Sequence, residues 1–132
     1  MATQLVMVGI VVANMTKSLE FYRRLGVSAP QGDAGGAPHV EIKMDNGLVF
    51  FLDTAEFARF YDPDRLTPSG GSRVTLEFLL GSPEEVDAKY TNMAIYGYTG
   101  HRPPFDTPFG ARFAMVDDPD GNTILISALL TK

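Results

Sequence analysis

The chain contains one pattern of expected elements twice, and this duplication constrains its fold more than any other feature of the sequence. Each copy reads as a strand, an amphipathic helix and a strand hairpin that continues into further strand. The first hairpin lies in residues 40–52 around Asn46-Gly47, a strong hairpin signal, and its counterpart in residues 112–126 reads as strand, tight turn and strand. Two such units can curl their sheets around one shared cavity, where a ligand would bind.

The strand and helix of the first copy have clear boundaries. Residues 6–12 form a short apolar run that predicts a strand buried on both faces. Asn14 or Thr16 can then cap a helix with one apolar face, and this helix is expected to end at Gly26. Residues 28–38 consist mainly of small, Gly and Pro residues, so we expect a loop there.

The second copy follows the same order. Residues 74–80 predict a strand, and Ser82 is expected to cap a helix that ends at Gly97, with Pro and Glu at favoured positions of its first turn. Residues 100–110 are interrupted by Pro and Gly and predict an aromatic loop before the closing hairpin. In this loop, His101 is expected to form hydrogen bonds rather than to act as a ligand or base.

We assign the whole chain, residues 1–132, to one domain of the α+β class with two βαβββ modules. Module one spans about residues 1–54 and module two about residues 73–132. The linker between them, about residues 55–72, begins with an ambiguous stretch in which Thr54 can cap a short helix.

Composition excludes several classes of function. The net charge is -5 and the 11 Lys and Arg residues are scattered, which argues against a nucleic-acid partner. The lack of cysteine excludes disulfides, thiolate metal sites and cysteine nucleophiles. No apolar run approaches the ~20 residues of a membrane span and no secretion signal is evident, so we expect a cytoplasmic protein without a membrane partner.

Two segments carry a resemblance to a known superfamily. They are Val8-Gly9-Ile10-Val11-Val12, which leads into Ser18-Leu19-Glu20-Phe21-Tyr22, and Asp118-Pro119-Asp120-Gly121-Asn122. With these markers the chain resembles the vicinal oxygen chelate superfamily of glyoxalases, extradiol dioxygenases and bleomycin resistance proteins. Further stretches are similar to its mitomycin-binding drug resistance subgroup: residues 18–27, 37–39, 53–54, 61–63 and 97–101.

The resemblance implies curved mixed sheets that enclose a cleft, and for the subgroup a drug-binding, module-exchanging homodimer without catalysis. Enzymes of the superfamily hold a divalent metal with His, Gln or Glu side chains. The matching positions fall at Met7, Thr75 and Leu125, and none of these side chains is a ligand for such an ion. We therefore expect neither a metal nor another cofactor, and no catalytic residue.

Four aromatic residues are candidates for the wall of a ligand site: Phe51, Phe105, Phe109 and Phe113. Core packing is the alternative for the strand residues, whereas Phe105 and Phe109 lie in the Pro-rich segment. In the drug-binding subgroup, aromatic residues at matching positions clamp a planar ligand. His39 is a further candidate for ligand contact, and it shares one strand face with Glu41. The alternative is that this face is a solvated outer face of the sheet.

Glu77 is expected in the middle of a strand, on the same face as Thr75, also a candidate for ligand contact. A carboxylate at such a position is costly unless it is paired or solvated. One hypothesis is an ion pair with Arg73 or Arg112. The other is a ligand-facing carboxylate, or a general base with a raised pKa.

These observations favour metal-independent binding of a small, planar or aromatic, antibiotic-like molecule, with resistance by sequestration. The alternative is a superfamily enzyme, such as a lyase, isomerase or dioxygenase-like protein, with an atypical metal or none. A module that binds only a protein partner is a third hypothesis. We expect a small-molecule ligand and a second copy of the chain as the partners.

Overall fold

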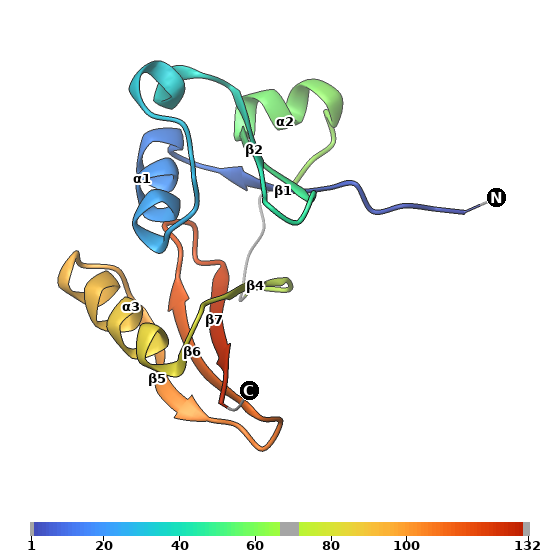
Figure 1. Cartoon of the computed structure of the whole chain (residues 1–132). Coiled ribbons are helices and arrows are strands. Elements are labelled where there is room, and N and C mark those ends of the chain that lie inside the picture. The colour runs from blue at the N-terminus through green and yellow to red at the C-terminus, as the bar shows by residue number, and fades with distance from the viewer. Residues whose placement is uncertain (1, 67–71, 131–132) are drawn as a thin grey trace. The chain divides into compact units, whose positions relative to one another are not determined.

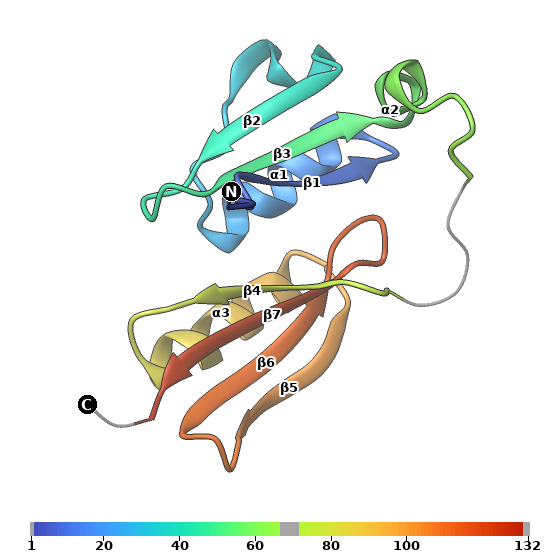
Figure 2. The same ribbon diagram turned by 90° about the vertical axis from the view of Figure 1, so that its right-hand side faces the viewer.

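The computed structural model describes residues 2–66 and 72–130. The chain divides into two compact units, Met1–Pro68 and Ser69–Lys132. Each unit combines one mixed sheet with helices, as Figures 1 and 2 show, which confirms the α+β class. No helix in the described part of the chain is both long and apolar enough to cross a membrane.

The first unit has three strands among its described residues. Its elements are β1 (Met7–Val12), α1 (Met15–Leu25), the short 3-10 helix η1 (Gly32–Gly36), β2 (His39–Lys43), β3 (Val49–Thr54) and α2 (Ala55–Tyr61). The strand order is β1-β3-β2, with β1 parallel and β2 antiparallel to β3. The ambiguous stretch after Thr54 is therefore a helix, and the Thr54 hydroxyl caps it by accepting from the Phe57 amide at 3.2 Å.

Helix α1 buries its apolar face against one side of this sheet. Of the two expected caps, Asn14 is the one used, and its side chain accepts from the Lys17 amide at 3.0 Å. The helix ends at Gly26, whose φ of 114° is the left-handed conformation that favours glycine. The buried Tyr22 ring meets the ring of Phe50 edge to face at 5.2 Å. The side chains of β3 that alternate with Phe50 consequently point to the opposite, open face.

The second unit contains a four-stranded sheet. Its elements are β4 (Thr75–Leu79), α3 (Pro83–Ile95), β5 (Gly100–Asp106), β6 (Ala111–Asp117) and β7 (Thr123–Leu129). The strand order is β4-β7-β6-β5, with β4 parallel to β7. The predicted Ser82 cap is confirmed, because the Ser82 hydroxyl accepts from the Glu85 amide at 3.3 Å; the same hydroxyl also donates to the Glu85 carboxylate at 3.2 Å.

The strand pairing shows how the two copies correspond. In each unit the first strand is parallel to the last strand of the hairpin, so β1 matches β4, and the β2–β3 hairpin matches β6–β7. The second unit has an additional strand, β5, where the first unit has η1. The expectation of an unstructured loop over residues 28–38 is thus wrong for Gly32–Gly36.

The predicted aromatic loop of residues 100–110 is also largely a strand. Gly100–Asp106 forms β5, at the edge of the sheet, despite Pro103 and Pro104. The pairing with β6 shifts its register between Gly100 and Arg102 and again between Arg102 and Phe105. Proline is tolerated at an edge and at such irregularities because no ladder hydrogen bond is required from it there.

Candidate functional site

The open face of the second sheet brings together four of the predicted site residues. Glu77 pairs with Leu125 in β7, Phe113 pairs with Ser127, and Phe105 pairs with Phe113, and paired residues point to the same side of a sheet. Thr75 lies two residues before Glu77 and shares this face. The opposite face holds the apolar residues buried with α3: Ala114, Val116, Ile124 and Ile126.

Glu77 is exposed on this face and is bound to a serine. The buried hydroxyl of Ser127 donates to its carboxylate at 2.7 Å. The hypothesis of an ion pair with Arg112 is wrong, because that guanidinium binds Asp87 at 2.7 Å and Asp106 at 2.8 Å instead. One hydrogen bond leaves acceptor positions of the Glu77 carboxylate available to a ligand.

A cluster of three phenylalanine rings is centred on Phe113 in the same sheet. Phe105 meets Phe113 edge to face at 6.0 Å, and Phe109 lies 6.4 Å from Phe113. Phe113 is paired with Ser127, the residue that binds Glu77, so the single strand β7 lies between Phe113 and the strand that carries the carboxylate. Phe109 is 79% exposed, which is unusual for so large an apolar side chain.

The turn that carries Phe109 is held by a residue that sequence reasoning missed. Thr107 is buried; its hydroxyl donates to the Ala111 carbonyl at 2.7 Å and accepts from the Phe109 amide at 3.2 Å. Gly110 completes the turn with a φ of 84°. The sequence contained a signal for this role. Thr107 lies two positions before Phe109 in a segment rich in Pro and Gly, and Thr hydroxyls often stabilise such turns. The turn therefore holds the backbone of Phe109 in a defined conformation.

Phe51 and His39 lie on the open face of the first sheet, in a different unit from the residues above. Phe51 pairs with Glu41 on one side and with Gly9 on the other, and His39 pairs with Asp53. A Cβ at Gly9 would stand 2.0 Å from the Phe51 ring, so glycine is required for the ring to lie across β1.

A polar cluster surrounds Asp53, a residue that sequence reasoning missed. This Asp53 cluster comprises His39, Glu41, Asp53 and Tyr61. Asp53 is 1% exposed; its carboxylate accepts from the Tyr61 hydroxyl at 2.6 Å and is bound to Nδ1 of His39. Nε2 of His39 lies 2.9 Å from the Glu41 carboxylate. An acidic residue at the end of the apolar run of β3 was the signal in the sequence.

The Asp53 cluster changes the acid–base properties of its members. Hydrogen bonds from His39 to Glu41 and Asp53 raise the pKa of the imidazole, since both carboxylates favour its protonated form. The hydrogen bond to Asp53 raises the pKa of the Tyr61 phenol, because the carboxylate disfavours the phenolate. His39 and Glu41 are consequently a bound pair rather than two independently solvated side chains.

A titration of His39 should show this shift. We expect a pKa above the ordinary 6.5, and Glu41→Gln should lower it towards that value because it removes the strongest partner. Since the raised pKa belongs to the folded state, the stabilisation is complete below the unfolded pKa and is lost as the pH rises through the folded one. NMR of the imidazole protons measures the pKa, with His39→Gln to assign the signals. A pKa at or below 6.5 in the wild-type protein would contradict the hydrogen-bonded pair.

The residues at the expected metal positions do not fit a divalent ion. Thr75 and Leu125 lie on the open face of the second sheet, and Met7 lies on β1 of the first. Thioether, hydroxyl and alkyl groups do not replace imidazole or carboxylate ligands. Within residues 2–66 and 72–130, no group of three or more His, Asp or Glu side chains could hold a metal ion.

Comparisons with known proteins agree with this architecture. The model of the Glyoxalase/Bleomycin resistance protein/Dioxygenase superfamily matches residues 4–126. A search of curated proteins found no match. Among solved structures, a glyoxalase/bleomycin resistance protein/dioxygenase family enzyme from Burkholderia phytofirmans PsJN has a TM-score of 0.81 at 18% identity, covering 97% of this chain and 100% of that one.

Two further solved structures are similar to the chain over most of its length. A glyoxalase/bleomycin resistance protein/dioxygenase from Nocardioides has a TM-score of 0.74 at 23% identity, covering 98% of this chain and 85% of that one. TioX from Micromonospora sp. ML1 has a TM-score of 0.66 at 17% identity, covering 97% of this chain and 100% of that one. At these identities the likeness shows the fold alone.

Proposed function

Because the chain belongs to the glyoxalase/bleomycin resistance protein/dioxygenase superfamily, we propose that it binds a small, largely planar organic molecule without a metal ion. The proposed biological result is resistance to that molecule by sequestration. The observation that carries the proposal is the open face of the second sheet, where Glu77 binds Ser127, Phe113 is paired with Ser127, and the exposed Phe109 ring lies 6.4 Å from Phe113.

The aromatic residues supply the proposed contact with a planar ring. Phe109 has most of its surface in water, and covering it with a ligand ring would be favourable by about 25 cal/mol for each Å² of apolar surface removed from water. Thr107 already restrains the backbone of the turn, so the loss of backbone entropy is small when the ring is covered. This arrangement supports a flat, apolar ligand surface.

Glu77 supplies the proposed polar contact. A carboxylate accepts hydrogen bonds and favours cations, so the ligand would carry a hydrogen-bond donor or a positive charge. The net charge of -5 also favours a neutral or cationic ligand over an anion. The superfamily description includes bleomycin resistance proteins, which supports an antibiotic as the class of ligand.

Substitution of Glu77 should separate ligand binding from stability. We expect Glu77→Gln to weaken binding by about 1–3 kcal/mol, since a charge-assisted hydrogen bond to the ligand is lost, while the amide keeps the bond from Ser127 and the fold. Calorimetric titration with planar natural-product antibiotics, with and without a chelator, measures the affinity. Glu84→Gln is the matched control, because Glu84 is an exposed residue of α3. Affinity unchanged in Glu77→Gln with a lowered melting temperature would assign Glu77 a structural role, and binding lost with the chelator would refute metal independence.

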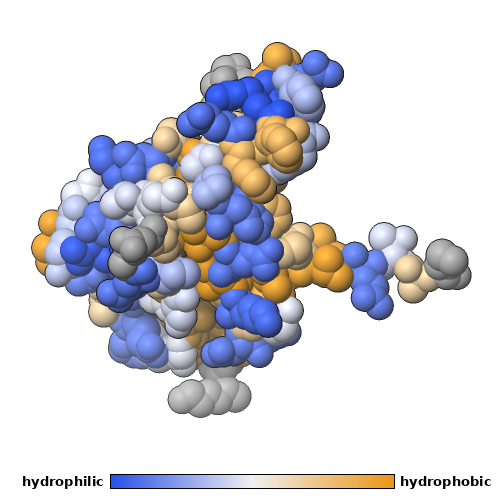
Figure 3. Space-filling view, turned by 90° about the horizontal axis from the view of Figure 1, so that it is seen from above, coloured by the Kyte–Doolittle hydropathy of each residue, from blue (hydrophilic) through white to orange (hydrophobic). Residues whose placement is uncertain are grey.

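The homodimer expected from the resemblance stays a prediction. Large apolar residues at the surface support it, among them Leu5, Val6, Leu79 and Leu129. Figure 3 shows hydrophobic residues on the surface of the extended N-terminal segment. Sedimentation should give about twice the 14.4 kDa of one chain. A monomer that binds ligand with full affinity would refute a site shared between two chains.

A further inference from the structure

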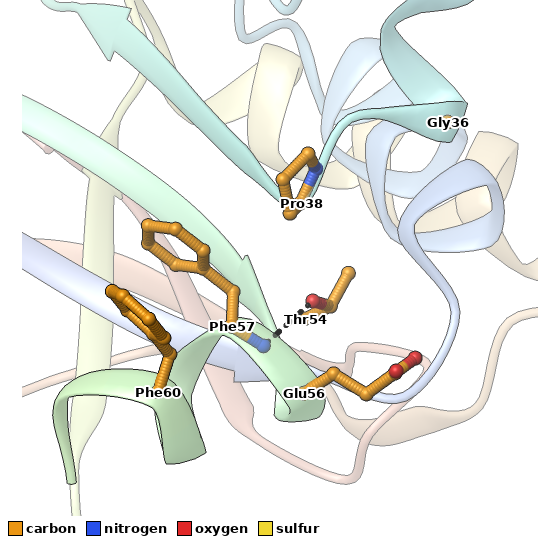
Figure 4. A pocket seen from close by; sticks show the side chains of 6 residues that line it. All are labelled: Gly36, Pro38, Thr54, Glu56, Phe57 and Phe60. Atoms are coloured by element: carbon orange, nitrogen blue, oxygen red, sulfur yellow. Dashed lines mark hydrogen bonds between the residues drawn. The ribbon is translucent and has the colours of Figure 1, made fainter.

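The first unit contains a pocket that the proposed function does not use. Its volume is about 500 Å³, and it lies beside the start of α2 (Figure 4). Six residues line it: Gly36, Pro38, Thr54, Glu56, Phe57 and Phe60. We propose that this pocket is a second ligand site, which takes a small aromatic cation such as an aromatic amine. The inference is independent of the Glu77 face, because every lining residue belongs to the first unit.

The walls of the pocket suit a flat ring. Phe57 and Phe60 lie one turn apart on α2, with ring centroids 6.3 Å apart and planes only 22° from parallel. Figure 4 shows both rings on the same side of the pocket, with Pro38 across from them. Phe60 is 82% exposed, so its surface is available to a ligand. The pocket is shallow and open to solvent, and its volume of about 500 Å³ leaves room for a small ring system.

Hydrogen bonds of Thr54 and ring contacts of Phe57 restrain the residues that line the pocket. The Thr54 amide donates to the Pro38 carbonyl at 2.9 Å, and the Thr54 hydroxyl accepts from the Phe57 amide. The Phe57 ring packs against the ring of His39 at 5.5 Å and against that of Tyr61 at 5.8 Å. Because the Asp53 cluster holds both His39 and Tyr61, it also holds the Phe57 wall. A site prepared in this way loses less entropy when it binds.

The charge of the residues that line the pocket indicates the polar group of the ligand. Glu56 is the one ionisable residue among the six that line the pocket, and it is exposed. It forms no ion pair with any residue in the described part of the chain. Arg59, the cation on the same helix, does not line the pocket. An aromatic ring between Pro38 and the phenylalanines would therefore place an attached ammonium group near an available carboxylate.

Three probes with one ring and different charges test the proposal: naphthylmethylamine, naphthylmethanol and naphthoate. Amide NMR spectra of the full chain locate each probe, and the titrations give its affinity. We expect the amine to bind most tightly and to shift amides of α2 and of residues next to Pro38. Phe60→Ala should weaken binding of the amine and the alcohol by about tenfold, because a stacking wall is lost.

Charge variants decide the role of Glu56. Glu56→Gln should lower the affinity for the amine by about threefold to fivefold, as expected for the loss of an exposed ion pair. The affinity for the alcohol should not change. Glu84→Gln is the matched control, since Glu84 is likewise an exposed first-turn glutamate, in α3. The proposal is overturned if no probe binds, if naphthoate binds as tightly as the amine, or if the shifts lie in the second unit and disappear in Phe109→Ala. That last result would leave the Glu77 face as a ligand site.

Discussion

Asp118→Ala should lower the free energy of unfolding by about 3 kcal/mol, although the residue is in a turn. Its buried carboxylate accepts from the amides of Asp120 and Asn122 at 2.9 and 2.8 Å, and from the Asn122 side chain at 2.9 Å. Hydrogen bonds to a charged group contribute about 1.5–3 kcal/mol each, and part of that is recovered by water in a partly exposed turn. The superfamily marker at residues 118–122 thus has a structural cause, since it closes the β6–β7 hairpin.

Urea denaturation followed by circular dichroism measures this effect, as a lower midpoint with an unchanged slope. Asp45→Ala is the matched control, because Asp45 lies in the corresponding turn of the first unit and is exposed. We expect that control to change stability by less than about 0.5 kcal/mol. A loss below about 1 kcal/mol in Asp118→Ala would show that the turn forms without the carboxylate.

Asp53→Ala should have an effect of similar size in the first unit, about 3 kcal/mol. The substitution removes the buried acceptor of both His39 and Tyr61, and hydrogen bonds to a charged group contribute about 1.5–3 kcal/mol each, part of which is recovered because both partners can bind water instead. It should also lower the pKa of His39, because one of the two carboxylates that favour the imidazolium is lost. Helix α2 would then lose the hydrogen bond that joins Tyr61 to β3.

A comparison with Tyr61→Phe divides this effect between the two partners. We expect Tyr61→Phe to cost about 1 kcal/mol, since it removes one hydrogen bond and no charge. Asp64→Ala, an exposed acid in the same unit, is the control for loss of negative charge. Equal stability of Asp53→Ala and Asp64→Ala in urea denaturation would refute the structural role of the Asp53 cluster.

Local signals in the sequence were sufficient for most element boundaries. Ser82 begins α3 as the expected N-cap, and Gly26 ends α1 in the left-handed conformation. Gly47 has a φ of 91° in the β2–β3 hairpin that was expected around it. These features depend on residues within four positions of one another, so the sequence contains the information that determines them.

Strand β5 shows where such local signals fail. Pro103 and Pro104 predict a break, yet the segment pairs with β6 because it lies at a sheet edge and its register shifts around the prolines. Whether a segment is an edge strand depends on the order of strands in the sheet. That order is set by contacts between residues far apart in the chain.

For the candidate sites, too, some features follow from local sequence and others depend on tertiary contacts. By itself the sequence determined which strand face each residue shares, as for Thr75 with Glu77 and His39 with Glu41, because strand alternation has a period of two residues. Only the tertiary structure decided the partners: Ser127 rather than Arg112 for Glu77, and Asp53 with Tyr61 beside His39. Partner choice depends on register between strands and on where α2 packs, and neither is encoded by neighbouring residues alone.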